Sequence, residues 1–194
     1  MFVGWHVAAE ALRRGHDVTC AARGVSGSVP AGARLVRVDR DDPDGLAALS
    51  GQDFDAVVDV ATVSYPWVKH ALRTLGDRVG HWTFVSTISV YADKETPGQT
   101  TDGPLLPPLL GQGARDVTSP DDYGSIKVAS ENAVRDALGD RAFVVRAGLI
   151  GGPGDTHDRF GYWPARLSQP ERNGGRVVVP DVPEQPVQFI DVRD

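Results

Sequence analysis

Short apolar runs alternate with amphipathic stretches along most of the chain, and this alternation restricts the possible fold more than any other feature. The apolar runs are rich in Val or Ala and nearly continuous, which is typical of strands covered on both faces. We expect strands over His16–Ala22, Arg34–Val38, Asp55–Ala61, His81–Ser86 and Arg141–Ala147. We expect helices over Gly4–Arg14, Pro43–Leu49, Pro66–Leu75 and Tyr123–Leu138. The pattern predicts an α/β fold built on a parallel sheet.

The alternation covers residues 1–150 and then stops. A Gly/Pro-rich stretch follows, with two further apolar runs beyond it, Arg176–Val179 and Val187–Ile190. We therefore expect a doubly wound parallel sheet over 1–150 and a small C-terminal lobe over 151–194. The segment Ala92–Asp122 differs from both, because it is rich in proline and shows no sustained period. Loops of this length are usually functional or disordered.

Charge and composition exclude several classes of function. The 194 residues include 20 Lys+Arg against 26 Asp+Glu, a net charge of −6, whereas a nucleic-acid binder needs a basic face. Cys20 is the single cysteine, which excludes an intramolecular disulfide and a cysteine-based metal site. The histidines show no metal-ligand spacing on a shared face, and no apolar run approaches the ~20 residues that span a bilayer. We expect a cytoplasmic protein with no metal, nucleic-acid partner or membrane contact.

The chain begins with a helix where a strand is expected. Met1–Gly4 leads directly into the apolar-faced stretch Trp5–Arg14. In dinucleotide-binding folds a strand and a glycine-rich turn precede such a helix. We expect a sheet that is incomplete on its N-terminal side, in which two strands each keep an unpaired edge. The polar end Asp191–Asp194 resembles the start of a helix, so a fragment or a misassigned start is the first interpretation and a genuine short variant the second.

Tyr123 and Lys127 give the sharpest chemical signal. Residues four apart on a helix lie on one face, one turn from each other. The lysine ammonium favours the phenolate and so lowers the pKa of the tyrosine from its reference value of about 10. Such a tyrosine can give a proton to a substrate oxygen or take one from it near neutral pH. The alternative is a surface lysine beside a half-buried tyrosine.

Ser86 and Thr87 place two hydroxyls at the end of the predicted strand His81–Ser86. The carboxyl edge of an open α/β sheet is where ligands bind. A hydroxyl there can hydrogen-bond a substrate oxygen and hold it against Tyr123. The alternative, a Ser/Thr pair that bonds the local backbone after a strand, is commoner in general.

Several segments together match one known family. They are Phe2–Gly4, Val38–Asp42, Asp55–Ala61, Val85–Thr87, Val90–Tyr91, Tyr123 with Lys127, Val145–Gly154 and Gln188–Asp194. On these residues the chain resembles the extended or atypical short-chain dehydrogenase/reductases of the NAD-dependent epimerase/dehydratase type, without the family's first strand and most of its glycine loop. The resemblance implies that 1–150 is an NAD(P)-binding Rossmann domain and that 151–194 is part of a substrate-binding lobe.

The resemblance also implies a role for each matching residue. Tyr123 would be the catalytic acid/base, with Thr87 hydrogen-bonding the substrate oxygen and Ser86 as the fallback for Thr87. Lys127 would hold the nicotinamide ribose and tune the tyrosine. The other cofactor contacts would come from Phe2, Val3, Gly4, Arg23, Asp39, Val60, Ala61, Ala147 and Leu149. Of these, the first three would lie under the pyrophosphate at a helix N-terminus, where amides and the helix dipole favour an anion.

Arg23 bears on the form of the cofactor. The run Ala21–Arg23 at the end of the first predicted strand holds no acidic residue for the ribose 2′-hydroxyl of NAD, and an arginine there suits the 2′-phosphate of NADP. NADP is therefore favoured over NAD. The alternative is a solvated arginine in a loop between strand and helix.

These expectations converge on an NAD(P)-dependent oxidoreductase of the reductase, epimerase or dehydratase type. Hydride would move between the nicotinamide and a carbonyl or alcohol carbon of a small-molecule substrate. A homodimer is compatible with this interpretation, because many members of the resembled family form dimers. Two alternatives stay open, a non-catalytic NADP-binding sensor or interaction protein and an inactive fragment.

Overall fold

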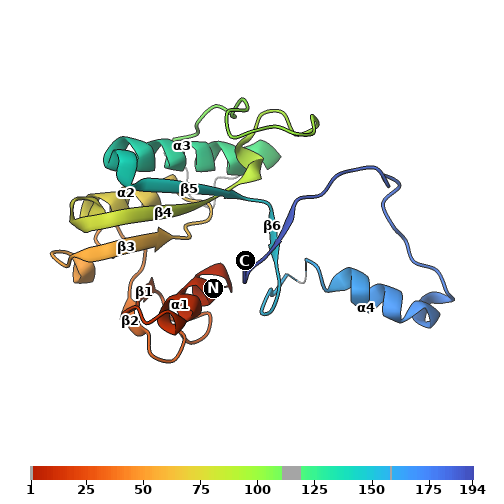
Figure 1. The fold of residues 1–194 in the computed structure, drawn as a ribbon, viewed down its shortest axis with the longest axis horizontal. Helices are drawn as coiled ribbons and strands as arrows, with labels where there is room; N and C mark the ends of the chain where they lie inside the picture. The colour runs from red at the N-terminus through yellow and green to blue at the C-terminus, as the bar shows by residue number, and fades with distance from the viewer. Residues whose placement is uncertain (1, 111–118, 158) are drawn as a thin grey trace. The chain divides into compact units, whose positions relative to one another are not determined.

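The computed structural model describes residues 2–110, 119–157 and 159–194 (Figure 1). These residues form two compact units, one of residues 3–147 and one of residues 148–194 together with Phe2. The first unit carries the alternating strands and helices that the sequence predicts. The roles assigned to 1–150 and 151–194 as cofactor and substrate domains stay predictions.

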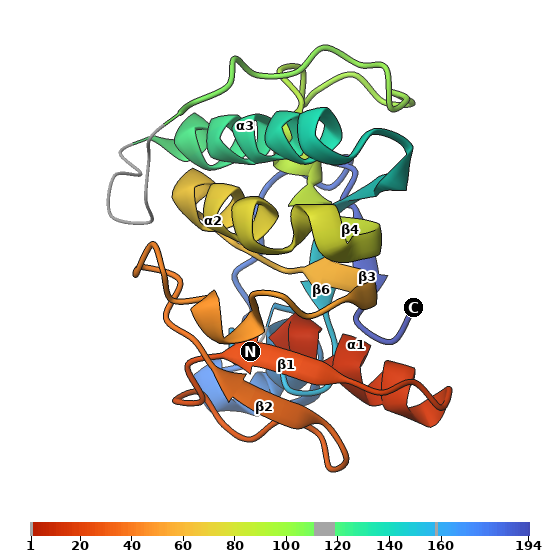
Figure 2. The same ribbon diagram turned by 90° about the vertical axis from the view of Figure 1, so that its left-hand side faces the viewer.

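The first unit contains a three-stranded parallel sheet of order β3–β4–β5. Its strands are β3 (Phe54–Asp59), β4 (Val79–Thr87) and β5 (Ala142–Ala147). The helices α2 (Tyr65–Leu75) and α3 (Pro120–Leu138) lie side by side over this sheet (Figures 1 and 2). Single 3-10 turns occur at Gly76–Arg78, Ile88–Val90 and Gly139–Arg141. The core between helices and sheet includes the fully buried side chains of Val68, Trp82, Phe84 and Val134.

A separate two-stranded parallel sheet pairs β1 (Thr19–Ala22) with β2 (Arg34–Arg37). No strand among the described residues joins β1 to β3, so the incomplete sheet that the sequence predicts is confirmed. The helix α1 (Phe2–Arg13) lies beside this small sheet (Figure 2). Ala8 is the one buried residue of α1 among the described residues. Parallel strands are normally covered on both faces, so this half of the unit is short of packing partners.

Local sequence signals set the ends of the helices. Ser64 caps α2 by accepting a hydrogen bond from the amide of Trp67. Ser119 and Asp122 form a reciprocal capping box at the start of α3, the N-terminal signature expected of a helix that begins with Ser-Pro-Asp-Asp. Gly15, with a φ of 87°, follows the end of α1 in the left-handed conformation that glycine adopts without a steric cost.

The prediction of a helix over Pro43–Leu49 is wrong for most of that range. Only a single 3-10 turn, Ala47–Leu49, forms there. The carboxylate of Asp42 accepts the amide N–H of Asp44, a local turn that competes with the helix. Gly45 also lies so close to the backbone carbonyl of Asp39 that no Cβ would fit. The approach of these two backbone segments therefore fixes a turn where periodicity alone predicts a helix.

The second unit has little regular structure. Its strands β6 (Leu149–Gly151) and β7 (Phe189–Asp191) pair in parallel, and its one α-helix among the described residues is α4 (Tyr162–Ser168). A 3-10 turn spans Pro170–Asn173. The apolar run Arg176–Val179 forms no strand, and Val178 is 88% exposed. Of Val187–Ile190, only the last two residues join β7.

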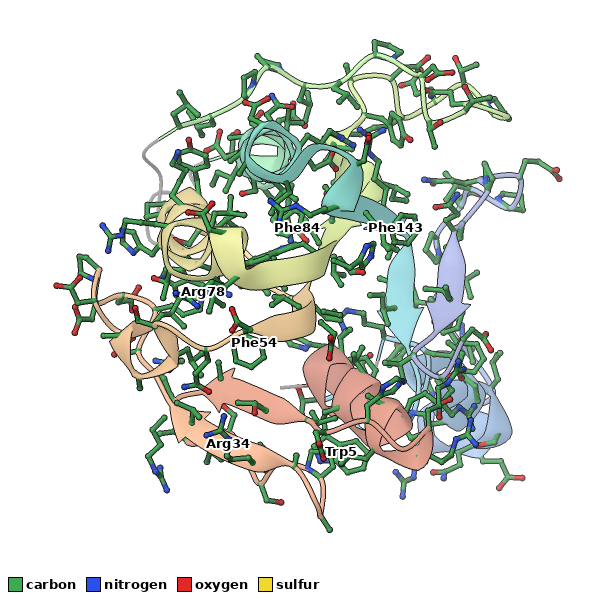
Figure 3. The ribbon with its side chains drawn as sticks, turned by 60° about the vertical axis from the view of Figure 1, so that its left-hand side comes forward. Trp5, Arg34, Phe54, Arg78, Phe84 and Phe143 are labelled. Carbon is green, nitrogen blue, oxygen red and sulfur yellow. The ribbon has the colours of Figure 1, made fainter. Side chains whose placement is uncertain are left out.

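Side chains divide the first unit into a dense and a sparse half. In Figure 3, Phe84 lies inside the layer formed by α2, α3 and the three-stranded sheet, whereas Trp5 lies on α1 beside the small sheet. Phe84 has no exposed surface, but Trp5 is 44% exposed. The dense half is where the predicted catalytic residues lie.

Candidate active site

Lys127 lies at the carboxyl ends of two neighbouring strands. Its ammonium donates hydrogen bonds to the carbonyl oxygens of Ala61, just beyond β3, at 2.5 Å, and of Val85 in β4 at 2.7 Å. The same Nζ is 4.6 Å from the centre of the Phe84 ring, within the range of a cation–π contact. Two of the three N–H donors are therefore used, and the third has no acceptor among the residues that the structure describes.

Burial changes the protonation of this lysine. The side chain is almost wholly removed from water, and this desolvation lowers the pKa of Lys127 to about 8, against the opposing pull of the Asp59 and Glu131 carboxylates. Asp59 is itself buried and accepts two hydrogen bonds from the Arg40 guanidinium at 2.7 and 3.1 Å. The ammonium is thus held next to compensated charges rather than in a direct ion pair.

Ser86 and Thr87 end β4, as the sequence predicts, but their hydroxyls are used differently. Ser86 donates to the Glu131 carboxylate at 2.5 Å. Thr87 accepts the amide of Ser89 and lies 3.2 Å from the Ser89 hydroxyl, so it caps the turn that follows the strand. The local backbone bonding considered as the alternative is therefore real for Thr87, whereas Ser86 bonds a side chain on α3. A substrate contact by Thr87 is compatible with this bonding, because the hydroxyl can rotate to donate its proton to another oxygen while it still accepts the Ser89 amide.

Glu131 is the centre of a buried charged network that sequence reasoning missed. Its side chain has no exposed surface and accepts hydrogen bonds from Ser86, from Arg135 at 3.0 Å and from Arg146 at 2.8 Å. Arg146 also donates to the hydroxyl of Tyr91 at 3.1 Å and stacks on its ring. The network therefore joins α3, the ends of β4 and β5, and the start of the segment that follows Val90.

The electrostatics of this network favour the ionised pair. Burial alone would raise the pKa of Glu131, but the hydrogen bonds from Arg146 and Ser86 outweigh it and the net shift is downward. The pKa of Arg146 is raised, chiefly because its guanidinium donates to Glu131. The sequence carries a signal for this network: Arg146 is the one charged residue within β5, and Glu131 follows Lys127 at helical spacing.

Tyr123 lies in the first turn of α3, half-buried, one turn before Lys127. The next residue, Gly124, packs so tightly on the Ser89 carbonyl that a Cβ there would come within 2.1 Å of that oxygen. The start of α3 is therefore pressed against the turn that Thr87 caps. The structure thus brings Tyr123, Lys127 and Thr87 to the same edge of the sheet, while their catalytic roles stay predictions.

The residues predicted to hold the cofactor lie at several strand ends and one helix start. Phe2, Val3 and Gly4 form the first turn of α1, which contains no acidic residue. Arg23 follows β1 directly and is exposed. Asp39 follows β2, and its carboxylate accepts the amide of Asp41 at 3.0 Å.

The remaining predicted contacts are distributed between the two units. Val60 and Ala61 follow β3, and Ala61 already binds Lys127 through its carbonyl. Ala147 ends β5, opposite Thr87 in the strand register. Leu149 opens β6 in the second unit, where it is 40% exposed. The structure therefore groups Val60, Ala61 and Ala147 with the catalytic candidates, and places Leu149 in the other unit.

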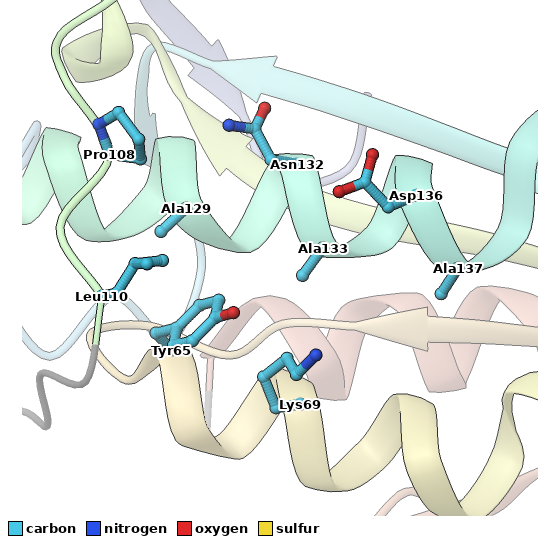
Figure 4. Close-up of a pocket in the computed structure, with 9 residues that line it drawn as sticks. All are labelled: Tyr65, Lys69, Pro108, Leu110, Ala129, Asn132, Ala133, Asp136 and Ala137. Atoms are coloured by element: carbon cyan, nitrogen blue, oxygen red, sulfur yellow. The ribbon is translucent and has the colours of Figure 1, made fainter.

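One surface groove lies away from this chemistry. Figure 4 shows it between α2 and α3, with a volume of about 500 Å³, lined among others by Tyr65, Lys69, Leu110 and Asp136. Its α3 residues are on the side of the helix away from Lys127 and Glu131, since successive helical residues are turned by about 100°. Within the described part of the chain no group of His, Cys, Asp or Glu side chains is arranged to hold a metal ion. None of the helices described there is long and apolar enough to cross a membrane.

Comparison with known proteins gives similarity at the level of structure. No family model matches the sequence, and no curated protein matches it. Among solved structures, a UDP-galactose 4-epimerase has a TM-score of 0.71 and 21% identity, over 99% of this chain and 65% of its own. The UDP-N-acetylglucosamine 4-epimerase of Bacillus cereus has a TM-score of 0.66 and 16% identity, over 100% of this chain and 66% of its own. TunA, an NAD-dependent NDP-hexosamine 5,6-dehydratase, has a TM-score of 0.69 and 18% identity, over 98% and 65%.

These similarities extend over nearly the whole chain, which spans about two thirds of the length of each of the three structures. The identities of 16–21% are low, but the TM-scores of 0.66–0.71 establish a shared fold. The parallel α/β arrangement and the resemblance that the sequence suggests are thereby confirmed as a matter of fold. The chain has the Rossmann-like fold of the NAD-dependent epimerases and dehydratases.

Proposed function

We propose that this chain carries the cofactor-binding and catalytic part of an NAD(P)-dependent oxidoreductase of the reductase, epimerase or dehydratase type. The observation that carries the proposal is Lys127, held by the carbonyls of Ala61 and Val85 one helical turn from Tyr123. A buried lysine fixed by two backbone carbonyls is more than a surface charge beside a tyrosine. Its position at the carboxyl edge of a parallel sheet is where such folds bind ligands.

The described residues fit a nicotinamide dinucleotide in two respects. The Lys127 N–H that has no acceptor among the described residues can donate to a ribose hydroxyl, and the first turn of α1 presents backbone amides and contains no acidic residue. Asp39 and the residues after β3 supply the rest of the predicted groove. When bound, such a cofactor supplies hydride exchange with a carbonyl or alcohol carbon.

Each side chain then has a defined task. Tyr123 gives a proton to the substrate oxygen during reduction and takes it back during oxidation. Thr87 hydrogen-bonds that oxygen and orients it, while Lys127 holds the ribose and stabilises the phenolate of Tyr123. Ser86 is committed to Glu131, which favours Thr87 over Ser86 for the substrate contact.

The cofactor that we propose is NADP rather than NAD, because Arg23 follows β1 where an acidic residue would bind the ribose of NAD. The substrate is a small molecule with a hydroxyl or carbonyl group, processed in the cytoplasm by a chain that can form homodimers. UDP-galactose and UDP-N-acetylglucosamine are the first compounds to test, since two of the similar structures are named for them.

The first experiment is a titration of the chain with NADPH and then NADH, following the fluorescence of the nicotinamide. Saturable binding supports the proposal, and binding of neither nucleotide overturns it for this chain. Tyr123→Phe then tests the chemistry: it should abolish turnover of an identified substrate and leave cofactor affinity nearly intact. Lys127→Ala should weaken both, which separates the two roles. Nucleotide binding with no redox chemistry on any alcohol or carbonyl would favour the non-catalytic sensor instead.

A further inference from the structure

Arg37 ends β2 directly beside the residue that precedes Arg23. The parallel register pairs Ala22 of β1 with Arg37 of β2, so both strands reach the same carboxyl edge at this point. Arg23 and Gly24 follow Ala22 and begin the loop after β1. Two arginines, one at the end of β2 and one just after β1, are therefore brought to the edge at which ligands bind in parallel α/β sheets.

Gly24 makes room for the Arg37 side chain. A Cβ on Gly24 would lie 3.0 Å from Nη1 of Arg37 and 3.2 Å from a methyl group of Leu35. The φ of Gly24 is 74°, in the left-handed region that favours glycine. The guanidinium of Arg37 therefore lies against the bare backbone of the turn, next in sequence to Arg23.

Neither arginine has a partner among the residues that the structure describes. The other arginines before Val79 all donate to a side-chain or backbone oxygen: Arg13, Arg14, Arg34, Arg40, Arg73 and Arg78. The carboxylate nearest in sequence to Arg37, that of Asp39, accepts the amide of Asp41 instead. The two exceptions among these arginines thus belong to one turn, where Arg37 lies against Gly24 and Arg23 precedes it, and the described residues offer neither an ion pair to an acidic side chain.

We propose that Arg37 and Arg23 form a two-armed subsite for a phosphate monoester, the 2′-phosphate of the proposed NADP. Guanidinium groups bind phosphate oxygens through paired, charge-assisted hydrogen bonds, and two of them match the two negative charges of a monoester. Gly24 is the floor of this subsite, since a Cβ there would press on the Arg37 guanidinium at 3.0 Å and shift it. The inference rests on the proposed function and adds to it a second strand and a second arginine.

The test compares the affinities of the two dinucleotides for matched variants of the chain. Arg37→Gln and Arg23→Gln should each lower the affinity for NADPH about 10- to 100-fold and leave the affinity for NADH within about twofold, the range expected for a lost charge-assisted hydrogen bond. Arg34→Gln is the control. Arg34 lies at the other end of β2, where it donates to Thr19 and Gln52, so this substitution should change neither affinity. NADH binding also reports that each variant is folded.

The outcomes separate this inference from the proposed function. The subsite is supported if the wild-type chain binds NADPH more tightly than NADH and both Arg37→Gln and Arg23→Gln lose this preference. Equal binding of NADPH and NADH by the wild-type chain overturns the subsite and leaves the proposed function standing. An Arg37→Gln variant that keeps the full preference for NADPH removes Arg37 from it. Binding of neither nucleotide overturns the proposed function and the subsite together.

Discussion

Two glutamates in similar sequence settings show how differently the two halves of the first unit are built. Glu10 on α1 contacts Arg13 and Arg14, and Glu131 on α3 contacts Arg135 and Arg146. The Glu10 side chain is 43% exposed, whereas that of Glu131 has no exposed surface. The same pairing of residue types is therefore a solvated surface contact in one half and a buried network in the other.

This difference in burial follows from the number of strands and helices that pack together in each half. The half with β3, β4 and β5 has two helices over three paired strands, and its charged groups are compensated internally, as Glu131 with Arg146 and Asp59 with Arg40 show. The half with β1 and β2 has two strands and one helix, and leaves Arg23 and Arg37 unpaired among the described residues. One half holds the residues of the proposed catalytic site, and the other holds the two arginines of the proposed subsite.

The largest expected effect comes from matched tryptophans in the two halves. Trp82→Ala removes a side chain with no exposed surface from the centre of the core and should lower the free energy of unfolding by about 3–5 kcal/mol. Trp5→Ala removes a half-exposed ring from α1 and should cost about 1 kcal/mol or less. Urea unfolding of both variants measures the difference.

A third variant keeps this test specific to packing. The indole N–H of Trp82 is buried without a hydrogen-bond partner among the described residues, so Trp82→Phe removes an unsatisfied donor together with part of the ring. It should cost clearly less than Trp82→Ala. Equal losses for Trp82→Ala and Trp5→Ala would show that the two halves are packed alike and would remove the basis of the comparison.

The second effect concerns the buried network. Glu131→Gln keeps the shape of the side chain but leaves the Arg146 guanidinium, only 10% exposed, without its charged partner. Removing one member of a buried ion pair costs about 3–5 kcal/mol, and we expect the lower end because the amide still accepts a hydrogen bond. Chemical unfolding at pH 7 measures it, with Arg135→Gln, which removes a half-exposed partner, as the milder control. A loss no larger than that of the control would contradict the central role of Glu131.

The third effect is a dependence of stability on pH that belongs to Lys127. Burial lowers the pKa of this lysine to about 8, while the unfolded chain keeps it near its usual 10.5. Between these values the unfolded state binds more protons than the folded state, so stability rises with pH. The rise from pH 7 to 9.5 should be about 2 kcal/mol for this residue.

Lys127→Met provides the comparison for that rise. The methionine has no charge to bury, so the variant should lack this part of the increase in unfolding free energy over the same pH range. All other titrating groups are shared by the two proteins, and the difference between their pH profiles isolates Lys127. If the two pH profiles ran parallel, the pKa of Lys127 would be the same in the folded and the unfolded chain, and the expected effect would be absent.

Much of the fold was predictable because its signals are local. The five strands follow apolar runs, and α3 follows a capping box whose members, Ser119 and Asp122, lie three residues apart. The turn over 43–49 and the strand β6 were missed for another reason. Gly45 is fixed by its approach to Asp39, and Leu149–Gly151 becomes a strand only by pairing with Phe189–Asp191, a contact that no local period reveals.

The candidate site divides in the same way. The spacing of Tyr123 and Lys127 predicts their shared helix face, because helix geometry depends on sequence separation alone. The carbonyls that hold Lys127 belong to Val85 in β4 and to Ala61 just beyond β3, and no spacing along the chain indicates them. For the same reason the sequence could not show that Glu131 takes the Ser86 hydroxyl.

The smallest expected effect concerns Glu10, the exposed glutamate of the opening comparison. Hydrogen bonds from Arg13, then Arg14, lower the pKa of Glu10 to about 2, which by itself predicts that Glu10 favours folding above pH 4.5 and loses this contribution as the pH falls toward 2. Because the carboxylate is solvated, salt and water screen the interaction and little of it reaches the stability. Glu10→Gln should therefore leave the thermal midpoint at pH 7 within error, at low and high salt alike. A loss comparable to that of Glu131→Gln would mean that α1 is packed far more firmly than its exposed side chains indicate.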